Sequence, residues 1–144
     1  MNEPDLRWVA DQLEILSLLA RLAHLADAGD LDDYVNLFTD DGCWEPPDDS
    51  EPPIRTLRGR ADLLMGARER RAVGMSGPGT NSRHVVTNTA LTKTGPDSAE
   101  AHSYWHFYTQ TNEIHQTAGM GTYDDEFRRT LDGWRLARRV SRLG

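Results

Sequence analysis

The first part of the chain is predicted to form one amphipathic helix over residues 5–28. Apolar residues recur there at spacings of three and four, as on one face of an α-helix. Advancing by about 100° per residue gives one apolar stripe, made of Val9, Leu13, Leu16, Ala20 and Ala23. Leu18, Leu22 and Leu25 form a second apolar set on another side, which a second layer or another subunit would cover.

Asp27 continues the first stripe, and it is the most unusual residue of this helix. A carboxylate in that position is expected to point at the core rather than at water. Burying it unpaired costs several kcal/mol, so it needs a partner, a proton or a water-filled cavity. The alternative is structural: Gly29 predicts a left-handed helix cap, and Asp27 would then cap the next helix or bond loop amides.

Shorter elements follow the long helix. They are, in order, a helix over residues 31–38, a strand over 43–45, a proline-rich loop over 46–53, a brief strand over 54–57, a helix over 60–73 and a loose segment over 74–82. In the second helix, Tyr34, Leu37 and Phe38 are expected to face inward. The conformation of the two loops, at 46–53 and 74–82, cannot be derived from their composition.

From residue 83 onward the apolar residues recur with a period of two, which predicts β-strands. Four strands are expected, over residues 83–92, 99–111, 118–130 and 134–142, with a hairpin turn at residues 131–133. Helices followed by a mainly antiparallel meander make an α+β fold. A curved sheet wrapped around three N-terminal helices would leave a conical cavity, with Asp27 aimed into it, in a single domain over residues 1–144.

The composition argues against nucleic acid and membranes as partners. The chain has 16 Lys and Arg against 23 Asp and Glu, a net charge of −7, so it lacks the excess of positive charge that nucleic acid or an anionic membrane requires. No apolar run approaches the roughly 18–20 residues of a membrane span. The single cysteine, Cys43, excludes an intramolecular disulfide and fits a reducing cytoplasm. The acidic N-terminus is not expected to be a signal peptide.

The histidines suggest acid–base chemistry rather than metal binding. His102 and His106 share one face of the strand over 99–111, but four residues of strand separate them by about 13 Å, too far for one ion. No metal and no cofactor are therefore expected. His84 opens the preceding strand on a face with Val86, Asn88 and Ala90.

Asp27 and His84 are the candidate catalytic residues. Facing each other across an apolar pocket, they would form a proton-transfer pair in which the carboxylate orients the imidazole and stabilises its charged form. His24, three residues before Asp27, is a rival partner. The chain contains no P-loop and no Gly-x-Ser-x-Gly elbow, and nothing near Cys43 in the sequence would activate its thiol.

Several segments, taken in order, resemble a known family. They are LAHLADAGDLDDYVNLFTDDGCW, LRGRADLL, SRHVVTNTAL, DSAEAHSYWHFY and GTYDDEFRRTLDGWRLARR. Together they resemble the SnoaL-like families of the nuclear transport factor 2-like superfamily, near scytalone dehydratase and bile-acid 7α-dehydratase. The resemblance implies a cone-shaped α+β barrel that forms a homodimer or homotrimer through its sheet. It also implies that Asp27 and His84 occupy the positions of the acid–base pair of the dehydratases.

The resemblance is incomplete at the site. The place of a second catalytic histidine of scytalone dehydratase falls near Thr109, and its two water-positioning tyrosines fall near Ala26 and Trp44. A different substrate is therefore expected. Trp44, Trp105 and Phe107 would form a flat aromatic pocket for a ring-shaped apolar substrate. Tyr34, Asn88 and Tyr123 are the candidate polar anchors.

The leading hypothesis is a cofactor-independent dehydratase or isomerase acting on a cyclic hydrophobic metabolite such as a polyketide or steroid. Two alternatives remain open. One is a binding module with the same fold and no chemistry. The other is a scaffold subunit like the β subunit of ring-hydroxylating dioxygenases.

Overall fold

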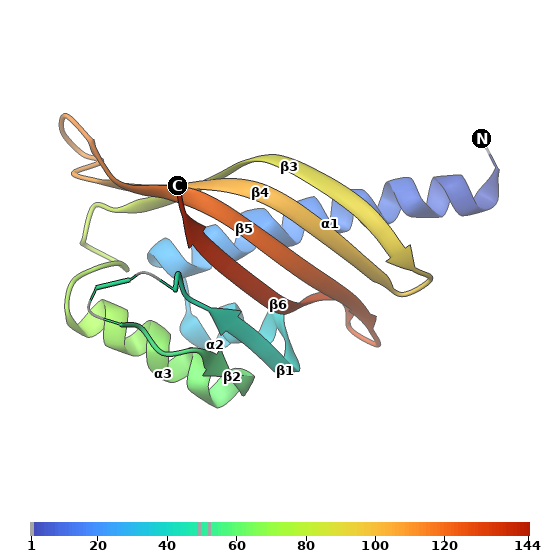
Figure 1. Ribbon diagram of the computed structural model, residues 1–144, viewed down its shortest axis with the longest axis horizontal. Helices are drawn as coiled ribbons and strands as arrows, with labels where there is room; N and C mark the ends of the chain where they lie inside the picture. The colour runs from blue at the N-terminus through green and yellow to red at the C-terminus, as the bar shows by residue number, and fades with distance from the viewer. Residues whose placement is uncertain (1, 49, 52) are drawn as a thin grey trace.

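Three helices and a six-stranded mixed sheet make up the fold (Figure 1). The computed structural model describes residues 2–48, 50–51 and 53–144. The helices are α1 (Glu3–Ala28), α2 (Leu31–Asn36) and α3 (Gly59–Ala72). The strands are β1 (Phe38–Glu45), β2 (Leu57–Arg58), β3 (Arg83–Gly95), β4 (Ser98–Thr109), β5 (Gln116–Thr130) and β6 (Gly133–Leu143).

The sheet is curled and remains open, so the expected barrel is in fact an open cone. Its strand order is β2-β1-β6-β5-β4-β3. Every pairing is antiparallel except that of β1 with β6, which is parallel. In Figure 1, α1 runs behind the long strands, and α2 and α3 lie below them beside β1 and β2. The helices therefore fill the concave side of the sheet.

The side of α1 that faces the sheet is not the predicted stripe. Ile15, Leu18, Leu19 and Leu22 are buried, whereas Val9, Leu13 and Leu16 are 42%, 65% and 41% exposed. Asp27 is nevertheless buried. The start of β3 covers the outer side of α1 at its last turn, and the backbone amide of His84 donates to the Asp27 carboxylate. Periodicity identified two apolar sides, and packing against the sheet selected the second.

Two local predictions at the end of α1 and after α2 are also wrong. Gly29 is extended (φ −100°, ψ −173°) rather than left-handed; a glycine is favoured there because a Cβ would lie 2.8 Å from the backbone Cα of Leu25. Asp30, not Asp27, caps α2. Strand β1 begins at Phe38, the last residue of the predicted helix over 31–38, and not at Cys43, because this segment pairs with β6 and the pairing overrides local preference.

A β-bulge in β3 changes which side chains face the cavity. Asn88 has a positive φ of 54°, and the register with β4 shifts between Thr87 and Ala90. The expected face continued from Val86 through Asn88 to Ala90, but both later residues are exposed. The extra residue puts Thr89 and Leu91 on the inner side, because each residue added to a strand reverses the alternation.

Asp11 connects α1 by hydrogen bonds to the sheet beside the turn between β5 and β6. This buried carboxylate accepts hydrogen bonds from Trp134 Nε1 at 3.1 Å and from Arg129 Nη2 at 2.8 Å. Burial opposes its charged form, but the bonds from Arg129 and Trp134 outweigh burial and lower the pKa of Asp11. The contribution to stability is therefore present above the unfolded-state pKa of about 3.9 and is lost as the pH falls through the folded-state value.

We expect Asp11→Ala to lower the free energy of unfolding by about 1–3 kcal/mol at neutral pH, because it leaves the Trp134 N–H buried without an acceptor. The loss should shrink below about pH 4. Urea unfolding at both pH values measures it. Ser17→Ala, an exposed change on the same helix, is the control. Equal unfolding energies for Asp11→Ala and Ser17→Ala would contradict the role given to Asp11.

Candidate functional site

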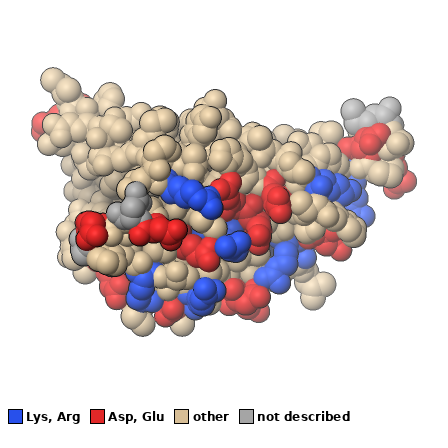
Figure 2. All heavy atoms as spheres, viewed as in Figure 1, with Lys and Arg blue, Asp and Glu red and all other residues tan. Residues whose placement is uncertain are grey.

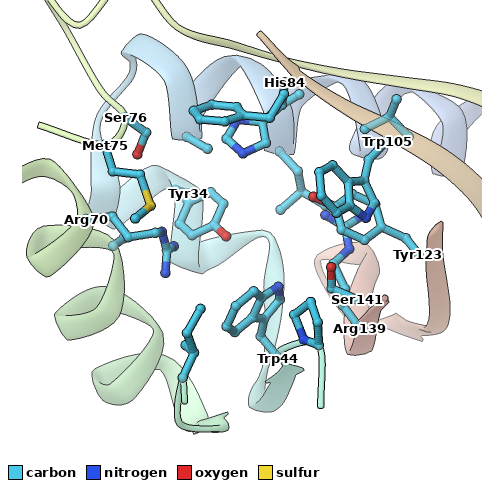
Figure 3. A pocket seen from close by; sticks show the side chains of 18 of the residues that line it. Tyr34, Trp44, Arg70, Met75, Ser76, His84, Trp105, Tyr123, Arg139 and Ser141 are labelled. Carbon is cyan, nitrogen blue, oxygen red and sulfur yellow. The ribbon is translucent and has the colours of Figure 1, made fainter. Parts of the chain in front are cut away.

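A cavity of about 270 Å³ lies between the helices and the concave face of the sheet. This volume is near the lower end of the range of small-molecule sites, about 300–1,000 Å³. Its walls come from every layer of the fold (Figure 3): Tyr34 of α2, Trp44 of β1, Arg70 of α3, His84 of β3, Trp105 and Phe107 of β4, Tyr123 of β5, and Arg139 and Ser141 of β6. Most of these side chains are aromatic or apolar, so the cavity suits a ring-shaped molecule.

His84 and Asp27 form a close hydrogen-bonded pair at one wall. His84 Nδ1 lies 2.6 Å from Asp27 Oδ1, and the His84 backbone N–H lies 3.0 Å from Oδ2. One carboxylate thus fixes both the backbone and the ring of the same histidine. Asp27 is 5% exposed, and its oxygens are held behind the ring rather than in the cavity.

The ring of His84 points into the cavity (Figure 3). Because Nδ1 is bonded to a carboxylate, it carries the proton in the neutral form of the ring, and Nε2 then has a free lone pair. Phe107 packs against the ring, with centroids 4.6 Å apart. An imidazole held in this way can accept a proton from a bound molecule and return it.

Five of the six predicted substrate-binding residues line the cavity: Tyr34, Trp44, Trp105, Phe107 and Tyr123. Asn88 does not, because the bulge turns it to solvent. His24, the rival partner of Asp27, lines a second groove, between α1 and β3, that Asp27 and His84 also line, but the imidazole bonded to Asp27 is that of His84. His102 pairs with Asp124 on the outer face of the sheet, with Nδ1 2.7 Å from Oδ1. Cys43 is buried, and burial raises the pKa of its thiol.

A buried ion pair at the cavity is the main feature that the sequence pattern did not predict. Arg139 Nε and Nη2 each donate to Asp125 at 2.8 Å, and the guanidinium carbon lies 3.8 Å from the centre of the Tyr123 ring. Alternation from Trp134 and Leu136 would have placed Arg138 inward. The register shifts opposite the step from Glu126 to Phe127, so Ala137 is an extra residue and Arg139 turns inward instead.

At neutral pH, Arg139 and Asp125 stay charged and Tyr123 stays neutral. Burial opposes the charge of Arg139, but the carboxylate of Asp125 more than offsets it and raises the pKa of the guanidinium. Burial pulls the pKa of Asp125 upward, towards the neutral form. We take the pair as ionised, because arginine does not give up its proton and it contacts both carboxylate oxygens. Burial raises the pKa of Tyr123 to about 12, so its hydroxyl stays protonated.

Two glycines make room for the aromatic wall. In the register of β4 and β5, Gly121 lies opposite Trp105 and Gly119 opposite Phe107. The Trp105 indole packs over both glycines, stacks on Tyr123 with centroids 5.9 Å apart, and donates from Nε1 to the Thr122 carbonyl at 3.2 Å. The alternating glycines of Gly-Met-Gly were a sequence signal for this close approach.

Among residues 2–48, 50–51 and 53–144, no group of three or more His, Cys, Asp or Glu side chains is placed to hold a metal ion. None of the helices in that part of the chain is both long enough and apolar enough to cross a membrane.

Comparison with known proteins places this architecture in a family. Residues 7–140 match the model of the SnoaL-like domain. The chain belongs to the SnoaL-like family. A search of curated proteins gave no match.

Several solved structures have a similar fold. An NTF2-like protein with a cystatin-like fold from Novosphingobium aromaticivorans is 26% identical, with a TM-score of 0.83, and the match covers 97% of this chain and 86% of that one. A protein of unknown function from Mycobacterium tuberculosis is 26% identical, with a TM-score of 0.81 and coverage of 100% and 77%. A protein from Catenulispora acidiphila, in complex with S-DNPA, is 21% identical, with a TM-score of 0.74 and coverage of 92% and 94%.

Gly121→Ala is expected to lower the free energy of unfolding by about 3 kcal/mol or more, because over-packing of this kind is strongly destabilising. A Cβ at Gly121 would lie 1.8 Å from the Arg142 carbonyl oxygen and 2.8 Å from the Trp105 ring. Gly119→Ala is the matched control: its Cβ would lie 3.1 Å from the same ring, so a small ring movement relieves it. Thermal unfolding compares the two variants, and similar melting temperatures would contradict this account of the wall.

Proposed function

We propose that this SnoaL-like protein is a cofactor-independent acid–base enzyme, a dehydratase or isomerase of a cyclic hydrophobic metabolite such as a polyketide or steroid. One observation carries the proposal: His84 is bonded through Nδ1 to buried Asp27 while the other side of its ring faces an aromatic cavity. Asp27 and His84 are then the catalytic residues, as in the dehydratases that the sequence resembles. Tyr34, Trp44, Trp105, Phe107 and Tyr123 bind the substrate. The single buried thiol of Cys43 fits a cytoplasmic setting.

In the proposed reaction, His84 Nε2 takes a proton from a carbon next to a carbonyl group. The electron pair of that C–H bond moves into the adjacent C–C bond, and the carbonyl becomes an enolate. Asp27 stabilises the imidazolium that forms, without taking up its proton. In a dehydratase, the enolate electron pair then forms a double bond between the α- and β-carbons, the carbonyl re-forms, and the bond from the β-carbon to its hydroxyl breaks. The imidazolium protonates that leaving oxygen, and water is released. In an isomerase, the imidazolium instead protonates another carbon of the conjugated dienolate, and the carbonyl re-forms. No electrons enter or leave, so no redox partner is required.

Proton exchange at a ketone α-carbon tests the acid–base function without knowledge of the natural substrate. A panel of cyclic ketones, including 1-tetralone and 2-tetralone, is incubated with the protein in D₂O, and loss of the α-proton signal is followed by NMR. We expect exchange above the buffer rate for at least one ketone. Asp27→Asn and His84→Gln should each lower that rate by about 10²–10⁴-fold, the usual contribution of a positioned acid–base group.

His102→Gln is the matched control. It removes a second histidine bonded to an aspartate, at 2.7 Å, but on the outer face of the sheet, so exchange should be unchanged. If no ketone in the panel exchanges faster than in buffer, or if Asp27→Asn and His84→Gln exchange like wild type, the enzyme proposal fails. Binding of the ketones without exchange would instead favour the binding-module alternative.

We propose further that the protein forms a homodimer or homotrimer through the outer face of its sheet. Val85, Tyr104 and Met120 are exposed apolar side chains on adjacent strands of this face. In Figure 2, the charged side chains gather in the lower part of the molecule, and the upper part, over β3 and β4, is largely uncharged. The uncharged part of this face suits a second copy of the same surface better than a charged partner.

Light scattering after size-exclusion chromatography tests this assembly. Wild type should have two or three times the chain mass of 16.2 kDa, and Met120→Glu should have the single-chain mass, because it places a charge in the interface. Leu13→Glu, at the exposed side of α1, is the control and should keep the wild-type mass. A single-chain mass for wild type, or dissociation by Leu13→Glu alone, would contradict an interface on the sheet.

A further inference from the structure

The buried Arg139 has one nitrogen that the fold does not use. Nε and Nη2 are both bonded to Asp125, and Nη1 has no hydrogen-bond partner among the described residues. The residue is only 7% exposed, yet it lines the cavity. A buried charged donor normally has an acceptor for each group of N–H bonds. Nη1 therefore offers two N–H bonds to whatever occupies this cavity.

The position of Nη1 is fixed before any ligand arrives. The bidentate contact with Asp125 sets the plane of the guanidinium, and Tyr123 packs against it at 3.8 Å. Ser141 lies two residues further along β6 and lines the same wall, as Figure 3 shows. A donor held this rigidly loses little freedom on binding, so it discriminates strongly between ligands that have and lack an acceptor.

This wall is separate from the one that holds His84. In the sheet, His84 lies opposite Phe107 on β4, whereas Arg139 lies opposite Asp125 on β5. The two residues thus stand on different strands and at different levels, and their side chains meet the cavity on different sides (Figure 3). A ligand that reacts at His84 would reach Nη1 with another part of its ring system.

The charges of Asp125 and Arg139 determine which kind of ligand oxygen Arg139 Nη1 can bind. Asp125 is 2% exposed and neutralises Arg139, so the pair has no net charge to offer. A carboxylate or phosphate at Nη1 would bring a negative charge next to Asp125, which repels it in a desolvated site. Arg70, which also lines the cavity, lies across it on α3, where its guanidinium packs over the Trp44 ring. A neutral carbonyl oxygen accepts from Nη1 without that repulsion.

We propose that Arg139 Nη1 is a substrate anchor that binds a neutral ring carbonyl, a ketone or quinone oxygen, remote from the carbon that reacts at His84. This deepens the proposed function and rests on it for the reaction at His84. It names the substrate class as a neutral, oxygenated polycyclic compound rather than a pure hydrocarbon or an organic acid. Arg139 acts in specificity and positioning, not in proton transfer.

Equilibrium dialysis with three naphthalene probes tests the anchor directly. The probes are 2-acetylnaphthalene, 2-ethylnaphthalene and 2-naphthoate, which present a neutral carbonyl, no oxygen and a carboxylate on one ring frame. We expect wild type to bind the ketone at least tenfold more tightly than either of the others. The double variant Asp125→Asn with Arg139→Gln replaces the ion pair by two neutral amides and should bind ketone and hydrocarbon about equally.

Two control variants separate this proposal from the proposed function. Arg138→Gln removes the neighbouring arginine, which faces outward and pairs with Glu45 and Glu126, and should keep the preference for the ketone. His84→Gln should also keep the preference, although it lowers the rate of proton exchange by about 10²–10⁴-fold. A variant that loses proton exchange but still prefers the ketone therefore reports on the role of His84 alone. A variant that loses the preference for the ketone but still catalyses exchange reports on the role of Arg139 alone.

For any ketone that exchanges, the double variant should raise KM at least tenfold and change kcat little, as expected for a group that binds but does not react. The anchor is overturned if wild type shows no preference for the ketone, prefers the carboxylate or binds no ketone up to its solubility limit. It is also overturned if the double variant keeps the preference. A double variant that does not fold is replaced by Arg139→Lys, whose single ammonium cannot hold Asp125 bidentately and also donate at Nη1; it should lose the preference too.

Discussion

The contact between the Asp27 carboxylate and His84 joins the two halves of the fold. Asp27 closes the last turn of α1, and His84 begins the run of long strands, so their contact fixes where the sheet starts relative to the helix. The carboxylate receives both a backbone and a ring N–H of one residue. Its burial is thereby compensated, and the orientation of the imidazole follows from the packing of the helix rather than from a flexible loop.

The end of α1 is also secured from the opposite side. Arg71 of α3 donates through Nη2 to the carbonyl oxygens of Leu25 and Gly29, at 3.0 and 2.7 Å. A cation at the carboxyl end of a helix is favourable because the exposed carbonyl groups carry partial negative charge. The last turn, which holds Asp27, is therefore held between β3 and α3. A rigid last turn is what a reproducible geometry at His84 requires.

The sequence predicted the elements well and their details less well. Period-two alternation located the strands, and the inward residues of β4 were correct because that strand has no bulge in its centre. The error at Asn88 occurred because one extra residue reversed the alternation, and Ala137 hid the inward position of Arg139 in the same way, since such a residue has no distinct hydrophobic signature. Helix periodicity offered two apolar sides of α1, and the choice between them depends on the position of the sheet. Asp27 was singled out through a stripe that faces solvent for most of its length.

The bulge at Ala137 has an evolutionary consequence. Leu136 and Arg139 both face inward although their positions differ by three, so the inward position of Arg139 depends on the bulge as much as on the arginine itself. If the same residues paired with β5 without the bulge, Arg138 would turn inward in place of Arg139 and would lose its pairing with Glu45. Lineages of this fold can thus gain or lose a charged cavity wall through a shift in strand pairing, without substituting any residue that touches the ligand.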